Sequence, residues 1–310
     1  MEGGESLLIG AVDIGGTKIA VGVVDEAGKV LARLECPTYA NRGPLDALDR
    51  IEALLRQGVK QAGGILSGIG IGCTGPVLPE TGTIGRAEFL TGWEGCNLVD
   101  ELGKRFRVSA AIENDADAAA LGEWAWGVGQ NTHQFILVTV GTGIGVGMVL
   151  NGQLYRGVEG AHPEIGHHVI DISGPGCYCG AKGCWESLAS GPAMERWAQD
   201  NHPCGTWFSA SQLCMEAERG QPLALTAVQR TAGYLGVGLA NLVTLFTPEV
   251  IALGGGLMQS HHLFWTKIVD SVRSSCALVP YEKVKILPSA LGNRTGLIGA
   301  ARVWYEKNRV

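Results

Sequence analysis

The chain has 310 residues, of which 46% are hydrophobic and 17% charged, and its formal net charge at pH 7 is −6. This composition is typical of a compact folded protein, and the length favours two lobes over one. The 24 Lys and Arg residues are dispersed among 30 Asp and Glu residues without a basic run, which argues against nucleic acid or an anionic membrane as a partner.

The predicted elements begin with three strands, rich in β-branched residues and joined by glycine-containing turns. They lie at residues 7–13, 19–25 and 30–35 and predict an antiparallel meander. An amphipathic helix, a strand, an irregular glycine-rich segment, a helix and a strand follow at 44–62, 69–73, 74–97, 98–106 and 108–112. The segment before the first strand, residues 1–6, lacks the basic and apolar regions of a signal peptide, so we expect a cytoplasmic protein.

The second half repeats this order. The apolar stretch 135–150 is interrupted by glycines and is shorter than the roughly 20 residues of a membrane-spanning helix, so it predicts two buried strands, 135–140 and 145–150. A strand, a glycine-threonine turn and a strand thus occur twice, which predicts two lobes of one architecture facing a cleft. The other predicted elements are a strand after Gly152, helices at 116–126, 185–200, 222–246 and 296–307, and a strand at 250–253.

A short segment contains one imidazole and three thiols, the ligand set of a closed tetrahedral zinc site. Disulfide bonding or idle thiols are the alternative, which the close spacing of the first two cysteines disfavours. Two carboxylates, Glu164 and Glu186, flank the segment, so a metal would hold polar groups around a common point. The predicted structural zinc ligands are His167, Cys177, Cys179 and Cys184.

Three glycine-rich turns follow predicted strands and favour nucleotide binding. In the first turn, backbone amides can face a phosphate beside a hydroxyl and a cation, and Asp13 can hold Mg²⁺ through water. Each turn alone is also an ordinary hairpin or loop, but three such turns from both halves indicate a nucleotide lying across a cleft. The predicted nucleotide-binding residues are Asp13, Gly15, Gly16, Thr17, Lys18, Gly141, Thr142, Gly143, Gly254, Gly255 and Gly256.

Asp115 follows a predicted buried strand and opens a predicted helix. A carboxylate at this place can accept the proton of an attacking hydroxyl, and the alternative is that Asp115 is only the helix N-cap. Glu164, His167 and Glu186 can hydrogen-bond several hydroxyls at once, as a sugar requires. The alternative for these three is a satisfied polar core around the zinc.

Together these motifs resemble the ROK sugar kinases, members of the actin-like, hexokinase and Hsp70 ATPase superfamily. The resemblance runs essentially end to end. It is carried by Asp13-Ile14-Gly15-Gly16-Thr17-Lys18, Glu113-Asn114-Asp115, the glycine-rich run 140–148, Glu164-Ile165-Gly166-His167, the cysteine-rich run 177–186, the run 248–256 and Gly296-Leu297-Ile298-Gly299-Ala300.

The resemblance implies an α/β fold of two actin-like (ribonuclease H-like) lobes with a nucleotide and sugar cleft between them. The small lobe would comprise residues 1–112 and 294–310, and the large lobe, with the zinc-binding loop, residues 113–293. It implies an ATP-dependent hexose kinase, a glucokinase acting on the 6-hydroxyl of glucose with Mg²⁺ and structural Zn²⁺, assembled as a homo-oligomer (dimer or tetramer). Asp115 would be the catalytic base, and Asn114, Asp115, Glu164, His167 and Glu186 would bind the sugar. An N-acetylhexosamine (GlcNAc or ManNAc) kinase is the alternative.

Two departures from the family pattern concern the sugar. Pro163, preceded by His162, stands where the family usually has Gly, and Glu88-Phe89 replaces a Pro-Asn pair. We expect them to affect the choice of sugar and not the phosphoryl-transfer residues. Two other classes are disfavoured: a DNA-binding regulator, because only residues 1–6 precede the first strand, and an inactive sugar-binding module, because Asp115 is present.

Overall fold

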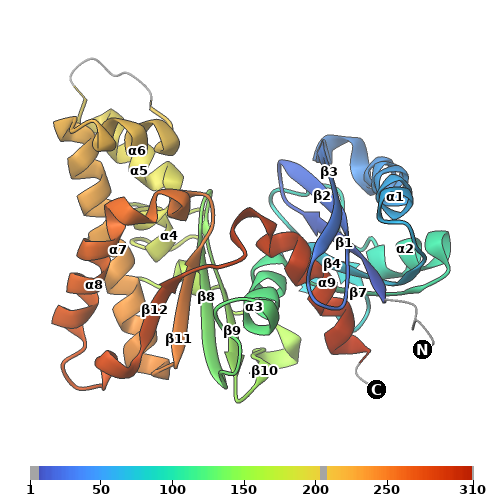
Figure 1. Ribbon diagram of the computed structural model, residues 1–310. Coiled ribbons are helices and arrows are strands. Elements are labelled where there is room, and N and C mark those ends of the chain that lie inside the picture. Colours follow the sequence, from blue (N-terminus) through green and yellow to red (C-terminus); the bar gives the residue numbers. More distant parts are fainter. Residues whose placement is uncertain (1–6, 203–207, 309–310) are drawn as a thin grey trace. The chain divides into compact units, whose positions relative to one another are not determined.

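The computed structural model describes residues 7–202 and 208–308, so the prediction made from residues 1–6 lies outside it (Figure 1). The chain divides into two compact units, the first made of residues 1–131, 147–163 and 293–310 and the second of residues 132–146 and 164–292. This contact-based division differs from the predicted lobe boundaries at 112/113 and 293/294, which stay a proposal.

The first unit is built on a sheet of order β3-β2-β1-β4-β7. β1 (Leu8–Ile14), β2 (Lys18–Val24) and β3 (Val30–Pro37) form the predicted antiparallel meander, and β4 (Leu66–Cys73) and β7 (Ser109–Asn114) run parallel to β1. Side chains of β1 alternate between the two faces. Val12 and Ile14 contribute to the core beneath α1 (Gly43–Ala62) and α2 (Leu98–Phe106), whereas Ile9 and Ala11 join the core beneath α9 (Thr295–Lys307).

Glycines let two helices approach this sheet and each other closely. A Cβ at Gly70 of β4 would collide with the Ala300 carbonyl of α9, and one at Gly68 with Trp304. A Cβ at Gly122 of α3 (Asp115–Trp126) would lie 2.8 Å from the Gly299 nitrogen of α9. Because any side chain would push these elements apart, the glycines fix α3 against α9 and thereby the position of the α3 N-terminus.

The second sheet has the order β10-β9-β8-β11-β12. β9 (Ile144–Leu150) follows β8 (Gln134–Val140), the short β10 (Gln153–Leu154) pairs antiparallel with β9, and β11 (Val250–Gly254) is parallel to β8 and to β12 (Lys285–Pro288). Its strand order matches that of the first sheet, in agreement with the repeat predicted from the two glycine-threonine turns. Its helices are α4 (Trp185–Ala189), α5 (Gly191–Asp200), α6 (Ala210–Glu218), α7 (Pro222–Phe246) and α8 (His261–Ser275).

The single helix predicted over residues 185–200 is wrong. The segment forms two helices, α4 and α5. The chain breaks there because Pro192 lacks an N–H and fits only the first turn of a helix. The Ser190 hydroxyl caps that new helix by accepting a hydrogen bond from the Ala193 N–H. The segment 74–97, predicted to be irregular, contains the hairpin β5 (Val77–Leu78) and β6 (Thr83–Ile84). Short 3₁₀ helices lie at Ala40–Arg42, Val158–Gly160, Ile165–His167, Leu257–Ser260, Tyr281–Lys283 and Gly292–Arg294.

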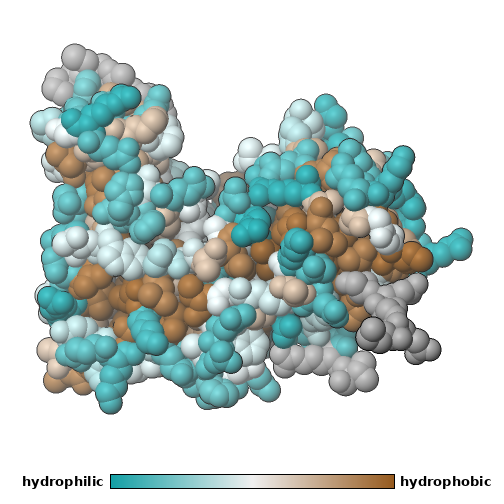
Figure 2. All heavy atoms as spheres, in the orientation of Figure 1, coloured by the Kyte–Doolittle hydropathy of each residue, from teal (hydrophilic) through white to brown (hydrophobic). Residues whose placement is uncertain are grey.

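On the visible face of each unit, hydrophobic residues gather in a patch that hydrophilic residues surround (Figure 2). Across the described ranges, no helix combines the length and the apolar character needed to cross a membrane.

Candidate active site and metal centre

Asp115 is the first residue of α3 and follows β7 directly. The helix N-cap is Asn114, whose side-chain oxygen accepts hydrogen bonds from the backbone N–H groups of Ala116 (2.9 Å) and Asp117 (3.3 Å). The alternative that Asp115 is the N-cap is therefore wrong, because the amide of Asn114 already occupies that position. Asp115 instead accepts a bond from the Ala116 N–H (2.9 Å) with one carboxylate oxygen.

Asp13, near the end of β1, lies in the same unit as Asp115. Burial, and then the nearby carboxylate of Asp115, raise the pKa of Asp13 to about 7. A side chain at Gly296 would collide with the Asp13 carboxylate, so the first turn of α9 lies directly against it. Two neighbouring carboxylates of this kind favour a bound cation, which would relieve their mutual repulsion.

The predicted phosphate-binding turn at residues 15–18 joins β1 to β2. The Gly15 N–H donates to the Lys18 carbonyl (2.9 Å), and the Thr38 hydroxyl donates to the Gly15 carbonyl (2.6 Å). The Lys18 ammonium lies 3.2 Å from the Glu35 carboxylate, and both side chains are exposed to solvent. The turn is thus held by its own backbone and by Thr38.

Phe89 packs over this turn, since a Cβ at Gly16 would lie 2.7 Å from the Phe89 Cβ. Phe89 is one of the two residues that depart from the family pattern in the 88–89 segment. The expectation that this departure leaves the predicted phosphoryl-transfer residues untouched is therefore wrong for Phe89. Gly16 and Phe89 are 73 residues apart in the chain and meet only in the tertiary fold, so no local sequence pattern reveals the contact.

The other two glycine turns meet in the second unit, at the ends of the parallel neighbours β8 and β11. The Gly141 N–H donates to the Gly143 carbonyl (2.9 Å), which closes the β8–β9 turn around the exposed Thr142. Gly255 has a φ of +91°, and a Cβ there would collide with Val140, while a Cβ on Gly141 would lie 3.8 Å from the Gly256 nitrogen. The turns at 141–143 and 254–256 therefore form one glycine-lined surface.

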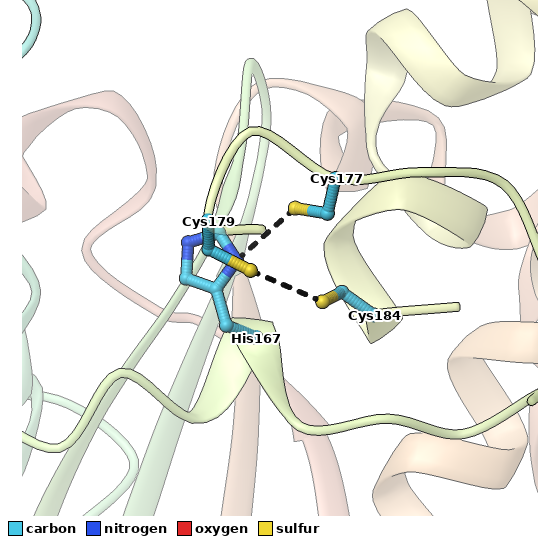
Figure 3. A group of neighbouring side chains, drawn as sticks. All are labelled: His167, Cys177, Cys179 and Cys184. Carbon is cyan, nitrogen blue, oxygen red and sulfur yellow. Dashed lines mark hydrogen bonds between the residues drawn. The ribbon is translucent and has the colours of Figure 1, made fainter. Parts of the chain in front are cut away.

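The four predicted metal ligands converge in the second unit (Figure 3). Their donor atoms all lie within 4.8 Å of one another. The Cys179 and Cys184 sulfurs are 3.5 Å apart, and the Cys177 sulfur is 3.4 Å from Nδ1 of His167. Sulfurs bound at about 2.3 Å to a tetrahedral zinc ion would lie roughly 3.8 Å apart, so this spacing fits the ion.

The electrostatics of the thiols also fit a cation. Burial, and then the thiols of Cys179 and Cys177, raise the pKa of Cys184 to about 12, whereas the backbone at Ala181 lowers the pKa of Cys179. Crowded thiols hold their protons because adjacent thiolates repel each other, and a dication removes that penalty. All eight cysteines among the described residues are free thiols, which disfavours the disulfide alternative.

The predicted sugar residues of the second unit gather around Tyr178, which the sequence analysis missed. Nε2 of His167 lies 2.9 Å from the Tyr178 hydroxyl, on the side of the ring away from the thiols. Burial and then the carboxylates of Glu186 and Glu164 raise the pKa of Tyr178. Glu186 also accepts a bond from the Ile144 N–H (2.9 Å) and so ties α4 to the β8–β9 turn. No signal beyond its place in the cysteine-rich loop marks Tyr178.

The remaining predicted sugar residue, Asn114, lies in the first unit beside Asp115. A set of buried or half-buried ionisable residues in that unit was not predicted from the sequence. Acidic residues flanking Asn114 and Asp115 were visible in the sequence, but their basic partners were not, because those lie about 40 residues further along. These residues are Glu113, Asp117, Arg156 and His162.

Several known proteins are similar to this chain over nearly its whole length. The chain is 34% identical to a glucokinase of Streptomyces coelicolor over 96% of this chain and 98% of the relative. The crystal structure of a ROK family glucokinase from Streptomyces griseus in complex with glucose and AMPPNP matches with a TM-score of 0.83 and 33% identity, covering 96% and 98% of the two chains. The ROK hexokinase of Thermus thermophilus matches with a TM-score of 0.85 and 32% identity, covering 98% and 100%. The ROK family model matches residues 9–307, and the chain belongs to the ROK family.

Proposed function

We propose that this protein is an ATP-dependent glucokinase that transfers the γ-phosphate of ATP to the 6-hydroxyl of glucose. The observation that carries the proposal is the carboxylate of Asp115 at the start of α3 beside Asp13, in a chain that matches a glucokinase over nearly its whole length. Asp115 begins a helix that Asn114 caps, and it has a second carboxylate next to it, which is an unusual environment for a purely structural aspartate.

In this proposal Asp115 accepts the proton of the attacking hydroxyl, as a positioned carboxylate can. Mg²⁺, when bound near Asp13, supplies neutralisation of the β- and γ-phosphate charge. The backbone amides of the turns at 15–18 and 141–143 donate to phosphate oxygens, with Thr17, Lys18 and Thr142 beside them. The residues Gly254, Gly255 and Gly256 leave room for the adenosine because they carry no side chains.

Asn114, Glu164, His167 and Glu186 bind the sugar in this proposal. Zn²⁺, when bound by His167, Cys177, Cys179 and Cys184, supplies a rigid anchor for the loop that carries Tyr178 and leads into Glu186. Because Nδ1 of His167 faces the thiols, its Nε2 is directed away from the metal and is able to donate to a sugar hydroxyl. That sugar hydroxyl would then take the place of the Tyr178 hydroxyl as the hydrogen-bond partner of Nε2.

The assembly and the location of the protein are further parts of the proposal. We include in the proposal a homo-oligomer in the cytoplasm with a sugar and ATP as its small-molecule partners. The proposal includes neither nucleic acid nor membrane as a partner, and the dispersed charge of the chain supports that part. The measurement for the assembly is the mass of the purified full-length protein by light scattering.

The sugar specificity is tested by a coupled assay with ATP across glucose, mannose, fructose, galactose, 2-deoxyglucose, GlcNAc and ManNAc. We expect glucose to have the highest kcat/KM. A site that bonds each hydroxyl is left with an unpaired partner by 2-deoxyglucose or galactose, at a cost of about 1–3 kcal/mol. That cost corresponds to roughly 5- to 150-fold in kcat/KM. A clearly higher kcat/KM for GlcNAc or ManNAc would replace the glucokinase proposal by an N-acetylhexosamine kinase.

A further inference from the structure

A cluster of ionisable side chains, two of them buried carboxylates, lies at the junction of β7 and α3 and has no part in the chemistry proposed so far. Arg156 forms ion pairs with the carboxylates of Glu113 and Asp117, and Nδ1 of His162 lies 2.6 Å from an Asp117 oxygen. Asp117 is fully buried and Glu113 is 6% exposed, while the Arg156 side chain is 19% exposed. All four residues belong to the first unit.

The two carboxylates flank the proposed base. Glu113 lies on β7 directly before Asn114, and Asp117 lies in the first turn of α3. The Asp117 N–H also donates to the Asn114 side chain, so the cap and the ion pairs share one residue. Arg156 therefore connects the strand side and the helix side of the junction that presents Asp115.

The charge balance makes this connection strong. Burial lowers the pKa of Arg156 to about 10, so the guanidinium stays protonated at neutral pH. Without it, two carboxylates would remain buried next to each other, which is strongly unfavourable, and the junction would have to open to hydrate them. The planar guanidinium can bond two carboxylates at once, whereas an ammonium is a single point charge.

Packing alone does not hold Arg156 in place. A cavity of about 390 Å³ in the first unit is lined by Glu113 and Arg156, together with apolar side chains that include Leu121 and Val303. The ion pair of Arg156 with Glu113 therefore borders this cavity on one side and is not enclosed by packed side chains there. Its geometry depends on the charges themselves.

We propose that Arg156 is a positioning residue for Asp115, fixing the β7–α3 junction from its two sides. His162 shares Asp117 with Arg156 and so ties the same junction to the segment that continues through Pro163 to Glu164. This inference rests on the proposed role of Asp115 as the general base. The imidazole of His162, the residue before Pro163, thus has a buried carboxylate as its partner.

The test compares Arg156→Met and Arg156→Lys with Arg105→Met. Arg105 is a matched control in the same unit, because its side chain is 21% exposed and also lies between two carboxylates, those of Asp49 (2.6 Å) and Glu52 (3.1 Å). Arg105 belongs to α2 and the two carboxylates to α1, so this ion pair is not part of the β7–α3 junction. Steady-state kinetics with glucose and ATP, melting temperature and glucose affinity by calorimetry are measured for each full-length variant.

We expect Arg156→Met to lower kcat by about 10- to 100-fold, because small displacements of a reacting group have effects of this size, with a much smaller change in the KM for ATP. The kcat of Arg156→Lys should lie between those of Arg156→Met and the wild type, since lysine keeps the charge but bonds one carboxylate at a time. Arg105→Met should keep kcat within about twofold even where its melting temperature falls. If Arg156→Met does not fold, the kcat of Arg156→Lys tests the inference, and we expect it to be lower than that of the wild type.

Normal kcat in a folded Arg156 variant, with a loss of stability like that of Arg105→Met, would overturn the inference and leave Arg156 a structural residue. Asp115→Asn, measured beside them, separates the two claims. An inactive Asp115→Asn with fully active Arg156 variants refutes only the positioning role. An active Asp115→Asn refutes the role of the base and, with it, the positioning of Asp115.

Discussion

Replacing Asp115 by asparagine is expected to lower kcat by about 10²- to 10⁴-fold, the usual cost of losing a general base. The fold and glucose affinity should be kept, because asparagine has the same shape and the helix cap is supplied by Asn114 and not by residue 115. The substitution also removes one of two neighbouring carboxylates, so the pKa of Asp13 should fall from about 7 towards its ordinary value.

The measurements are kcat and KM with glucose and ATP, glucose affinity by calorimetry and the melting temperature. Asp100→Asn is a matched control, because Asp100 also lies in the first turn of a helix, α2, whose cap is likewise an asparagine, Asn97. It should change kcat by less than about twofold, as exposed surface substitutions do. A near-normal kcat for Asp115→Asn would reduce Asp115 to a structural residue.

Replacing a cysteine of the metal centre by serine is expected to remove zinc and to lower both stability and glucose affinity. Cys184 should show the largest effect, because it is fully buried and directly precedes Trp185 and Glu186. Loss of the metal frees the loop that carries Tyr178, so we expect glucose affinity to fall by about 10- to 100-fold. Cys177→Ser and Cys179→Ser should act in the same direction.

The measurements are elemental analysis, melting temperature and glucose calorimetry on protein purified without chelator. Cys276→Ser provides the control, since Cys276 is also buried in the second unit but lies at the end of α8, apart from the cluster. It should keep its zinc and its glucose affinity. A wild-type protein with no zinc, instead of one ion per chain, would end the proposal of a structural metal.

The sequence predicted the local elements of this fold well, for physical reasons. The helices at 98–106 and 222–246 have both a periodic apolar face and terminal signals, and their bounds are confirmed. The strand pairs around the two glycine-threonine turns are likewise confirmed. The four metal ligands also converge as predicted, because they are close together in the chain.

What escaped prediction depends on contacts between distant segments. The ion pair of Arg156 with Asp117 joins residues 39 apart, and neither residue carries a local mark of its partner. Phe89 reaches Gly16 only through the tertiary fold. Helices α6 and α8 were missed altogether, and the break between α4 and α5 was overlooked although Pro192 signals it. Local pattern thus pointed to the proposed reacting groups but not to the residues proposed to hold them.

The proposed activity is tested most directly by ³¹P NMR of a reaction containing the full-length protein, ATP, Mg²⁺ and glucose. We expect the γ-phosphate signal of ATP to be replaced by one signal of glucose 6-phosphate, with one ADP formed for each sugar phosphate and no excess of inorganic phosphate. Unchanged ATP, release of inorganic phosphate alone, or phosphorylation at a different hydroxyl of glucose would contradict it.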